Sequence, residues 1–264
     1  MPLPLTFRDA IAASDRPLIG MWVSSGNPLI AEICADGGLD WLLIDMEHGP
    51  NHLESVLAQI QAVAPYAATA VVRVPGLLPV MIKQILDLGV QNLLMPMIDT
   101  PEQAEAAVRS VRYPPKGNRG VGSALARSAR WNRVDDYLTN ADEYISMFVQ
   151  IESVTGVDNA AAIAAVDGVD GVFVGPSDLA ASMGLIGQQT HPDVIAAVTK
   201  AFDGIRSTGK PFGVNAFDPA LADGYLADGA SFVLVGADVA LLARGAEALA
   251  KRFISDDGAT RAGY

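Results

Sequence analysis

Two carboxylates stand at the ends of two short apolar, β-branched stretches in the middle of the chain. Glu152 follows MFVQI, and Asp178 follows GVFVGPS, with the helix-length segment TGVDNAAAIAAVDG between them. This order predicts strand, helix, strand. Since consecutive strands of a parallel sheet end side by side, the two acids are expected to face one point. A pair of carboxylates there suits Mg²⁺, Mn²⁺ or Co²⁺, while the alternative is that both acids cap the helices that follow them.

Three further residues of chemical interest follow earlier apolar stretches. Asp45 and His48 lie in IDMEHGP, and Arg73 lies in VVRVP. A carboxylate three positions before an imidazole can hydrogen-bond with it and raise its basicity. A guanidinium nearby could stabilise negative charge on an enolate or carboxylate oxygen. The alternatives are a loop histidine that caps the next helix and an arginine that belongs to a buried ion pair.

The residues around these groups suggest how a substrate could be held. Gly175 and Ser177 would offer backbone N–H groups to a substrate carboxylate, while Pro176 has none to offer. Trp22 is expected to wall the site or to be ordinary packing. Together the set suits proton abstraction or carbon–carbon cleavage beside a carbonyl, with a metal-stabilised enolate. We see neither a strand-end lysine for a Schiff base nor a GxSxG motif for a serine nucleophile.

Eight near-continuously apolar stretches, each followed by a helical pattern, must position these groups. The predicted strands are 18–23, 41–44, 70–74, 93–97, 147–151, 172–174, 212–214 and 232–235. The predicted helices are 28–36, 53–63, 78–88, 101–112, 157–166, 192–207, 219–227 and 239–253. The alternation predicts an α/β fold with a parallel sheet, and eight units predict a closed (β/α)₈ TIM barrel with its chemistry at the carboxyl ends of the strands. An open doubly wound sheet is the alternative, but the first turn, SSGNPLIAE, lacks GxGxxG.

Composition narrows the class of protein. The 264 residues are expected to form one domain, with a core over about 17–253 and a mobile tail at 255–264. A net charge of −12 argues against nucleic acid or an anionic membrane as a partner. The lone Cys34 and the absence of a signal-peptide pattern or a long apolar run favour a cytoplasmic protein.

One segment departs from the alternating pattern, and the last helix allows two interpretations. The stretch 113–144 holds five basic residues before Asp135 and is either a functional loop or a solvated or subunit-contacting insertion. The last helix, over 238–253, has enough apolar residues to close the barrel or to dock on another subunit.

Several motifs resemble the HpcH/HpaI aldolase family. They are LLIDMEHGP, KQILDLGVQNLLMPMIDT, RYPPKGNRGVGSALARSARWNRV, QIES and GVDGVFVGPSDLAASMG, and the resemblance, closest to the 4-hydroxy-2-oxoheptanedioate aldolase branch, extends over about 17–252. It implies a TIM barrel and a class II pyruvate aldolase that uses a divalent metal ion and no organic cofactor. It also implies a homohexamer, a dimer of trimers, in which the C-terminal helix is exchanged between subunits.

The same resemblance assigns roles to the candidate residues. It makes Glu152 and Asp178 the metal ligands and Arg73 the group that binds the pyruvyl oxygen and steadies the enolate. It makes His48 and Asp45 the pair that moves the proton of the C4 hydroxyl, and places the pyruvate carboxylate at the backbone of 175–177. Asn215 stands where a leucine is often near the aldehyde, so the aldehyde stays open.

The resemblance implies retro-aldol cleavage of a 4-hydroxy-2-oxo acid, such as 4-hydroxy-2-oxoheptanedioate, to pyruvate and an aldehyde such as succinic semialdehyde. Three alternatives remain: a 2-dehydro-3-deoxy-sugar-acid aldolase, a citryl- or malyl-CoA lyase-like enzyme, and a non-catalytic barrel that binds or assembles other molecules.

Overall fold

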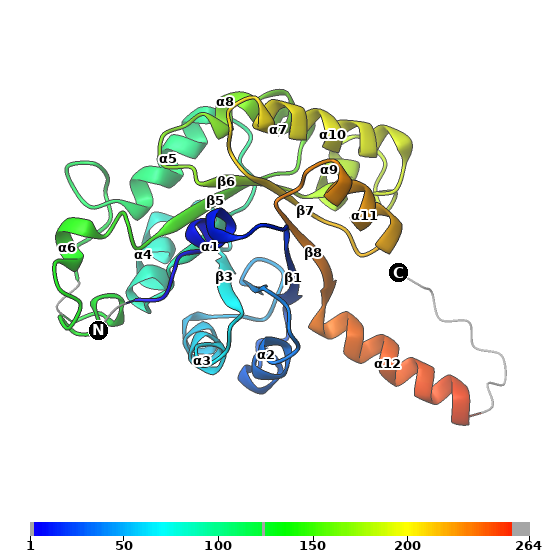
Figure 1. The fold of residues 1–264 in the computed structure, drawn as a ribbon, viewed down its shortest axis with the longest axis horizontal. Coiled ribbons are helices and arrows are strands. Elements are labelled where there is room, and N and C mark those ends of the chain that lie inside the picture. Colours follow the sequence, from blue (N-terminus) through cyan, green and yellow to red (C-terminus); the bar gives the residue numbers. More distant parts are fainter. Residues whose placement is uncertain (1–2, 123–124, 255–264) are drawn as a thin grey trace.

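The computed structural model of the chain, which describes residues 3–122 and 125–254, contains a closed barrel of eight parallel strands (Figure 1). The strands are β1 (Leu18–Val23), β2 (Trp41–Asp45), β3 (Thr69–Arg73), β4 (Asn92–Met95), β5 (Ser146–Ile151), β6 (Gly171–Val174), β7 (Phe212–Asn215) and β8 (Phe232–Ala237). The predicted barrel and its eight strands are confirmed, with strand ends displaced by at most two residues. The predicted tail at 255–264 lies outside the described residues.

Helices surround the barrel and mostly follow the predicted ranges. They are α1 (Phe7–Ala13), α2 (Pro28–Ala35), α3 (Leu53–Val63), α4 (Pro79–Asp87), α5 (Pro101–Val111), α6 (Tyr137–Asn140), α7 (Val154–Asp158), α8 (Ala160–Ala164), α9 (Pro176–Ser182), α10 (Pro192–Arg206), α11 (Pro219–Ala227) and α12 (Asp238–Phe253). The helix predicted over 157–166 is instead two helices. They separate at Asn159, whose side chain donates to the Asp99 carbonyl at 2.8 Å.

The helix α1 was not predicted, and it closes the amino end of the barrel. Its Phe7 ring lies 4.8 Å from the Trp41 ring and 5.4 Å from the Phe232 ring. Gly20 lies against the same cluster, where a Cβ would come within 2.5 Å of the Trp41 indole. This end of the barrel is therefore filled by aromatic side chains, which bury more apolar area per residue than aliphatic ones.

The described parts of the long segment, 113–122 and 125–144, contain α6 and a short 3₁₀ helix, η1 (Arg127–Ala129). Arg119 is fully buried there, with its guanidinium 4.6 Å from the Tyr113 ring and 3.6 Å from Asp87. Arg127 donates to the Leu88 carbonyl at 2.8 Å. These arginines hold the segment against α4, so its basic character is at least partly structural.

The last helix, α12, projects away from the barrel (Figure 1). The carboxylate of Asp238, its first residue, accepts hydrogen bonds from the backbone N–H groups of Ser24 and Ser25 at 2.9 and 3.0 Å. Beyond that anchor its apolar side chains are exposed, including Leu242 at 67% and Phe253 at 72%. Of the two interpretations left by the sequence, closure of its own barrel is wrong. Within the described ranges no helix is both long and apolar enough to cross a membrane.

Candidate active site

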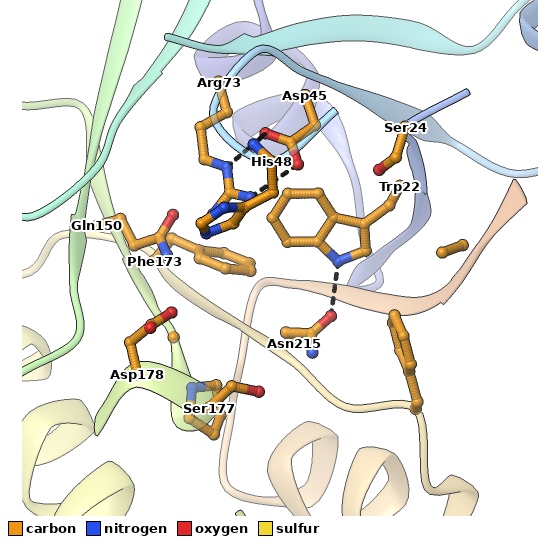
Figure 2. Close-up of a pocket in the computed structure, with 14 residues that line it drawn as sticks. Trp22, Ser24, Asp45, His48, Arg73, Gln150, Phe173, Ser177, Asp178 and Asn215 are labelled. Atoms are coloured by element: carbon orange, nitrogen blue, oxygen red, sulfur yellow. Dashed lines mark hydrogen bonds and ion pairs between the residues drawn. The ribbon is translucent and has the colours of Figure 1, made fainter. Parts of the chain in front are cut away.

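A pocket of about 250 Å³ opens at the carboxyl ends of the strands (Figure 2). Its lining comes from β1, β2, β3, β5, β6, β7 and β8 and the loops after them, and comprises Trp22, Ser24, Asp45, His48, Arg73, Gln150, Phe173, Gly175, Pro176, Ser177, Asp178, Asn215, Phe217 and Ala237. Nine of the ten residues predicted for the site are among them. Glu152, the tenth, is buried beside the pocket at 3% exposure.

Asp45 and Arg73 form a buried two-point ion pair at the end of neighbouring strands. The Arg73 Nε and Nη2 atoms donate to the two Asp45 oxygens at 2.9 and 2.8 Å. Strand pairing sets Asp45 directly beside Arg73, and both are less than 5% exposed. Nη1 lies 2.9 Å from Glu47 Oε2. Even with this ion pair counted, only three of the five guanidinium N–H groups are engaged, so one on each terminal nitrogen has no acceptor among the described residues.

The His48 side chain does not pair with Asp45 as the sequence suggested. Among the described residues, the Asp45 oxygens accept from Arg73 and from the backbone N–H groups of Glu47 and His48. The His48 imidazole is 66% exposed, and its Nε2 atom lies 4.0 Å from Glu47 Oε2. Asp45 therefore orients Arg73 and the loop backbone, and the imidazole is at the pocket mouth.

Glu47, which the sequence pattern did not single out, lies beside the pocket residues Arg73 and His48. Burial raises its pKa against the opposing effect of the Arg73 charge. Asp45 and Asp178 raise the same pKa, so all three acids are within electrostatic reach. Its position in the acid-rich DMEH motif was the signal that could have found it.

The Glu152 carboxylate is buried close to other acids. Its pKa is raised to about 7, chiefly by burial and also by the charges of Asp178 and Glu47, against the lowering effect of the Met97 N–H. Its Oε1 accepts from the Met97 backbone N–H at 2.9 Å, and its Oε2 accepts from the Gln150 side-chain amide. A buried carboxylate close to a second one disfavours its own charge, and a divalent cation reverses that penalty.

The backbone around Glu152 leaves room for this carboxylate. A Cβ at Gly175 would lie 2.8 Å from Glu152 Oε2 and 2.8 Å from Gln150 Nε2. Within the described part of the chain, no group of three or more His, Cys, Asp or Glu is placed to hold a metal ion. Glu152 and Asp178 would supply two oxygen ligands, and substrate and water would supply the rest. This set fits Mg²⁺, which usually keeps several waters and few protein carboxylates.

The backbone N–H groups expected to bind a carboxylate are only partly available. The Gly175 N–H donates to the Ile151 carbonyl at 3.1 Å and continues the pairing of β5 with β6. Ser177, in the first turn of α9, lines the pocket. Gln150, which was not predicted, also lines it, and its Oε1 atom is buried without a hydrogen-bond partner in the described structure.

Trp22 and Asn215 are joined across the pocket from β1 to β7. The indole Nε1 donates to Asn215 Oδ1 at 2.7 Å, drawn as a dashed line in Figure 2. The Trp22 ring also lies 4.3 Å from the Arg73 guanidinium and meets the Phe173 ring edge-on at 6.4 Å. The predicted wall of the site is thus a tryptophan in contact with the ion pair.

Comparison with known proteins decides the family. Residues 18–245 match the family model described as HpcH/HpaI aldolase/citrate lyase. The chain belongs to this family. It is 55% identical over 252 residues, 96% of this chain and 91% of the relative, to a hydroxypyruvate/pyruvate aldolase of Deinococcus radiodurans. It is 53% identical over 247 residues, 94% of each protein, to a 4-hydroxy-2-oxo-heptane-1,7-dioate aldolase of Salmonella paratyphi B.

A crystal structure from the same family agrees with the fold. A HpcH/HpaI aldolase/citrate lyase family protein from Burkholderia cenocepacia superposes with a TM-score of 0.89 at 40% identity, over 94% of this chain and 98% of that one. The predicted family and the prediction of a carbon–carbon lyase of the aldolase type are confirmed. Membership of this family implies a divalent metal ion.

Proposed function

We propose that this enzyme catalyses the reversible retro-aldol cleavage of a 4-hydroxy-2-oxo acid to pyruvate and an aldehyde. The observation that carries the proposal is the convergence at one end of the barrel of Arg73, with two available N–H groups, and the acids Glu152 and Asp178. The names of the Deinococcus and Salmonella relatives support it, because both name aldolases that act on oxo acids.

Glu152 and Asp178 would hold the metal ion, for which Mg²⁺, Mn²⁺ and Co²⁺ are candidates. When bound, the ion would polarise the 2-ketone so that the electrons of the breaking C3–C4 bond are accepted as an enolate. The two open N–H groups of Arg73 would donate to the oxygen on which this charge develops. Asp45 holds the guanidinium in place on two atoms, so little reorganisation is needed as the charge forms.

His48 is the candidate base for the C4 hydroxyl proton. Its exposed imidazole at the mouth can exchange protons with water, and Glu47, 4.0 Å away, would stabilise the imidazolium that results. Asp45 contributes by positioning Arg73 and the loop backbone. This division of roles revises the Asp45–His48 pair that the resemblance implied, and places Glu47 next to the imidazole.

The size of the pocket argues for small substrates. About 250 Å³ lies below the roughly 300–1,000 Å³ of sites for drug-sized ligands, so a CoA thioester would have to lie largely outside it. A 2-dehydro-3-deoxy-sugar-acid aldolase remains the alternative within the same reaction class, since it differs only in the aldehyde half of the substrate.

The exposed face of α12 supports the homo-oligomer implied by the resemblance. We propose that α12 packs on the barrel of a second copy, within a hexamer built as a dimer of trimers. Monomeric proteins rarely expose a contiguous apolar surface of this kind. Light scattering of wild type and of Leu242→Glu would test this, since a charge on this face should lower the oligomeric mass.

The function is tested by measuring pyruvate release from 4-hydroxy-2-oxo acids with added Mg²⁺, Mn²⁺ or Co²⁺, beside cleavage of citryl- and malyl-CoA. We expect metal-dependent pyruvate release and no thioester cleavage. Glu152→Ala and Asp178→Ala should each lose activity and calorimetric metal binding together. Thioester cleavage without pyruvate release, or metal-independent activity, would overturn the proposal.

A further inference from the structure

We propose that Asn215 presents an N–H donor to the aldehyde, so that the enzyme selects aldehydes with an oxygen acceptor close to the carbonyl group over alkyl aldehydes of the same size. This inference rests on the proposed function and names the substrate class for the second half of the reaction.

The pocket has two chemically different halves. Arg73, Gln150 and Asp178, on the side of β3, β5 and β6, would engage the 2-oxo acid. The opposite half comes from three consecutive strands of the closed barrel, β7, β8 and β1, and consists of Asn215, Phe217, Ala237, Trp22 and Ser24. An aldehyde that reacts with a 2-oxo acid held by the first half has this second half as its surroundings.

Trp22 determines which way the Asn215 amide points. An indole Nε1 is a donor only, so the atom that faces it at 2.7 Å must be the amide oxygen. The amide nitrogen therefore points away from the indole (Figure 2). No described residue accepts a hydrogen bond from this Nδ2, although the side chain is only partly exposed. The second half of the pocket thus offers a donor of fixed direction.

The direction is held because Trp22 is itself fixed. The Arg73 guanidinium lies over its ring, the Phe173 ring meets it edge-on, and Arg73 is bound at two points by Asp45. A flipped amide would set its NH₂ group against the indole N–H, which loses the hydrogen bond and opposes two donors. While Trp22 keeps this position, the Asn215 oxygen therefore stays bound to the indole, and the amide nitrogen is the atom that has no partner among the described residues.

The apolar neighbours of Asn215 increase the effect of its N–H donor on substrate selectivity. Phe217 and Ala237 are apolar, so an alkyl aldehyde that enters this half covers the amide without pairing it. A site that leaves a polar group unpaired discriminates more strongly than one that only misses a methylene. An oxygen on the aldehyde that accepts from Nδ2 avoids that penalty.

The decisive experiment compares two aldehydes of equal length as partners for pyruvate and Mn²⁺. Methoxyacetaldehyde carries an ether oxygen, an acceptor only, where butanal carries a methylene. We expect wild-type kcat/KM to favour methoxyacetaldehyde by about tenfold or more. Equal values, or a preference for butanal, would overturn the inference.

Three variants locate the source of that preference. Asn215→Asp keeps an acceptor for the Trp22 N–H and replaces the donor by an acceptor, so the ratio should fall to one or invert. Asn215→Leu should bring it close to one. Trp22→Phe removes the hydrogen bond that orients the amide, so the ratio should fall but stay above one. An unchanged ratio in Asn215→Asp would overturn the assignment of the donor.

Failure here can be told apart from failure of the proposed function. Exchange of the pyruvate C3 hydrogens with D₂O needs the metal and the enolate but no aldehyde. Wild-type protein that exchanges these hydrogens yet does not distinguish the two aldehydes retains the proposed function and loses this inference. Protein that does not exchange them loses both.

Discussion

Along β2 the inward side chains change from Trp41 through Leu43 to Asp45. Along β5 they change from Phe148 to Gln150, with Glu152 just past the strand end. Because side chains alternate across a strand, one face of each strand contributes to both ends of the barrel interior. At the amino end the inward side chains belong to a cluster of aromatic rings beneath α1. At the carboxyl end they belong to a group of charged side chains around an open pocket.

The two ends differ in how completely their side chains are satisfied. In the aromatic cluster the rings of Phe232 and Phe148 lie 5.3 Å apart, edge to face, a geometry that aromatic pairs prefer. At the pocket, Gln150 Oε1 is buried without a hydrogen bond, and Glu152 has its pKa raised to about 7. Perturbed and unsatisfied groups are concentrated at functional sites. The packing at the amino end therefore stabilises the fold, whereas the groups at the carboxyl end lower its stability and serve function.

Removing a ring from the amino end should give the largest effect, and on stability alone. Phe232→Ala deletes a ring that contacts those of Phe7, Trp41, Phe148 and Phe173, and should lower the free energy of unfolding by about 3–5 kcal/mol. Chemical denaturation would measure the loss, with Phe232→Leu as the milder control. A large fall in kcat for the folded fraction would contradict the division between the ends.

Removing the Arg73 guanidinium from the carboxyl end should lower activity and leave the protein folded. Arg73→Ala withdraws the donors that we propose face the developing enolate, and it should lower kcat by about 10²–10³-fold. Arg73→Lys keeps a charge but loses the two-point geometry with Asp45, so it should be intermediate. Steady-state kinetics on protein shown by circular dichroism to be folded would measure this. Near-normal turnover of Arg73→Ala would remove Arg73 from the mechanism.

The buried Glu152 should make the metal-free protein sensitive to pH. The folded state keeps the proton up to about pH 7, whereas the unfolded chain releases it near the ordinary value of 4.5. The free energy of unfolding should therefore fall between pH 4.5 and 7, by up to about 3 kcal/mol. Denaturation in EDTA at pH 5 and pH 8 would measure it. Glu152→Gln should flatten the dependence, and an equally steep dependence in that variant would assign it elsewhere.

The sequence was sufficient for those features that depend on order along the chain. Eight apolar stretches with helices between them predict a barrel, and the rule that chemistry follows strand ends brought Asp45, Arg73, Glu152 and Asp178 to one mouth. The helix α1 was missed because its seven residues, of which only Phe7 is buried, are too few to show a sustained helical pattern.

Pairing within the site could not be predicted, because it depends on distances across the barrel. Asp45 is closer along the chain to His48 than to Arg73, yet strand pairing places Arg73 directly beside it. The hydrogen bond from Trp22 to Asn215 spans 193 positions and depends on barrel closure. Glu47 was overlooked because the DMEH motif marks a group of acids but does not show which of them faces Arg73.

The smallest expected effect comes from one methyl group at the boundary of the pocket. Gly175→Ala would bring a Cβ within 2.8 Å of Glu152 Oε2 and Gln150 Nε2, so the carboxylate must move. Displacing a ligand from its supporting contacts typically costs 10–100-fold in metal affinity, and we expect that loss in Mn²⁺ calorimetry with little change in melting temperature. Gly224→Ala is the matched control, since a Cβ there meets no atom within 4 Å. Unchanged Mn²⁺ affinity in Gly175→Ala would mean that the ion does not depend on the position of Glu152, and the carboxyl end would then need a different metal site.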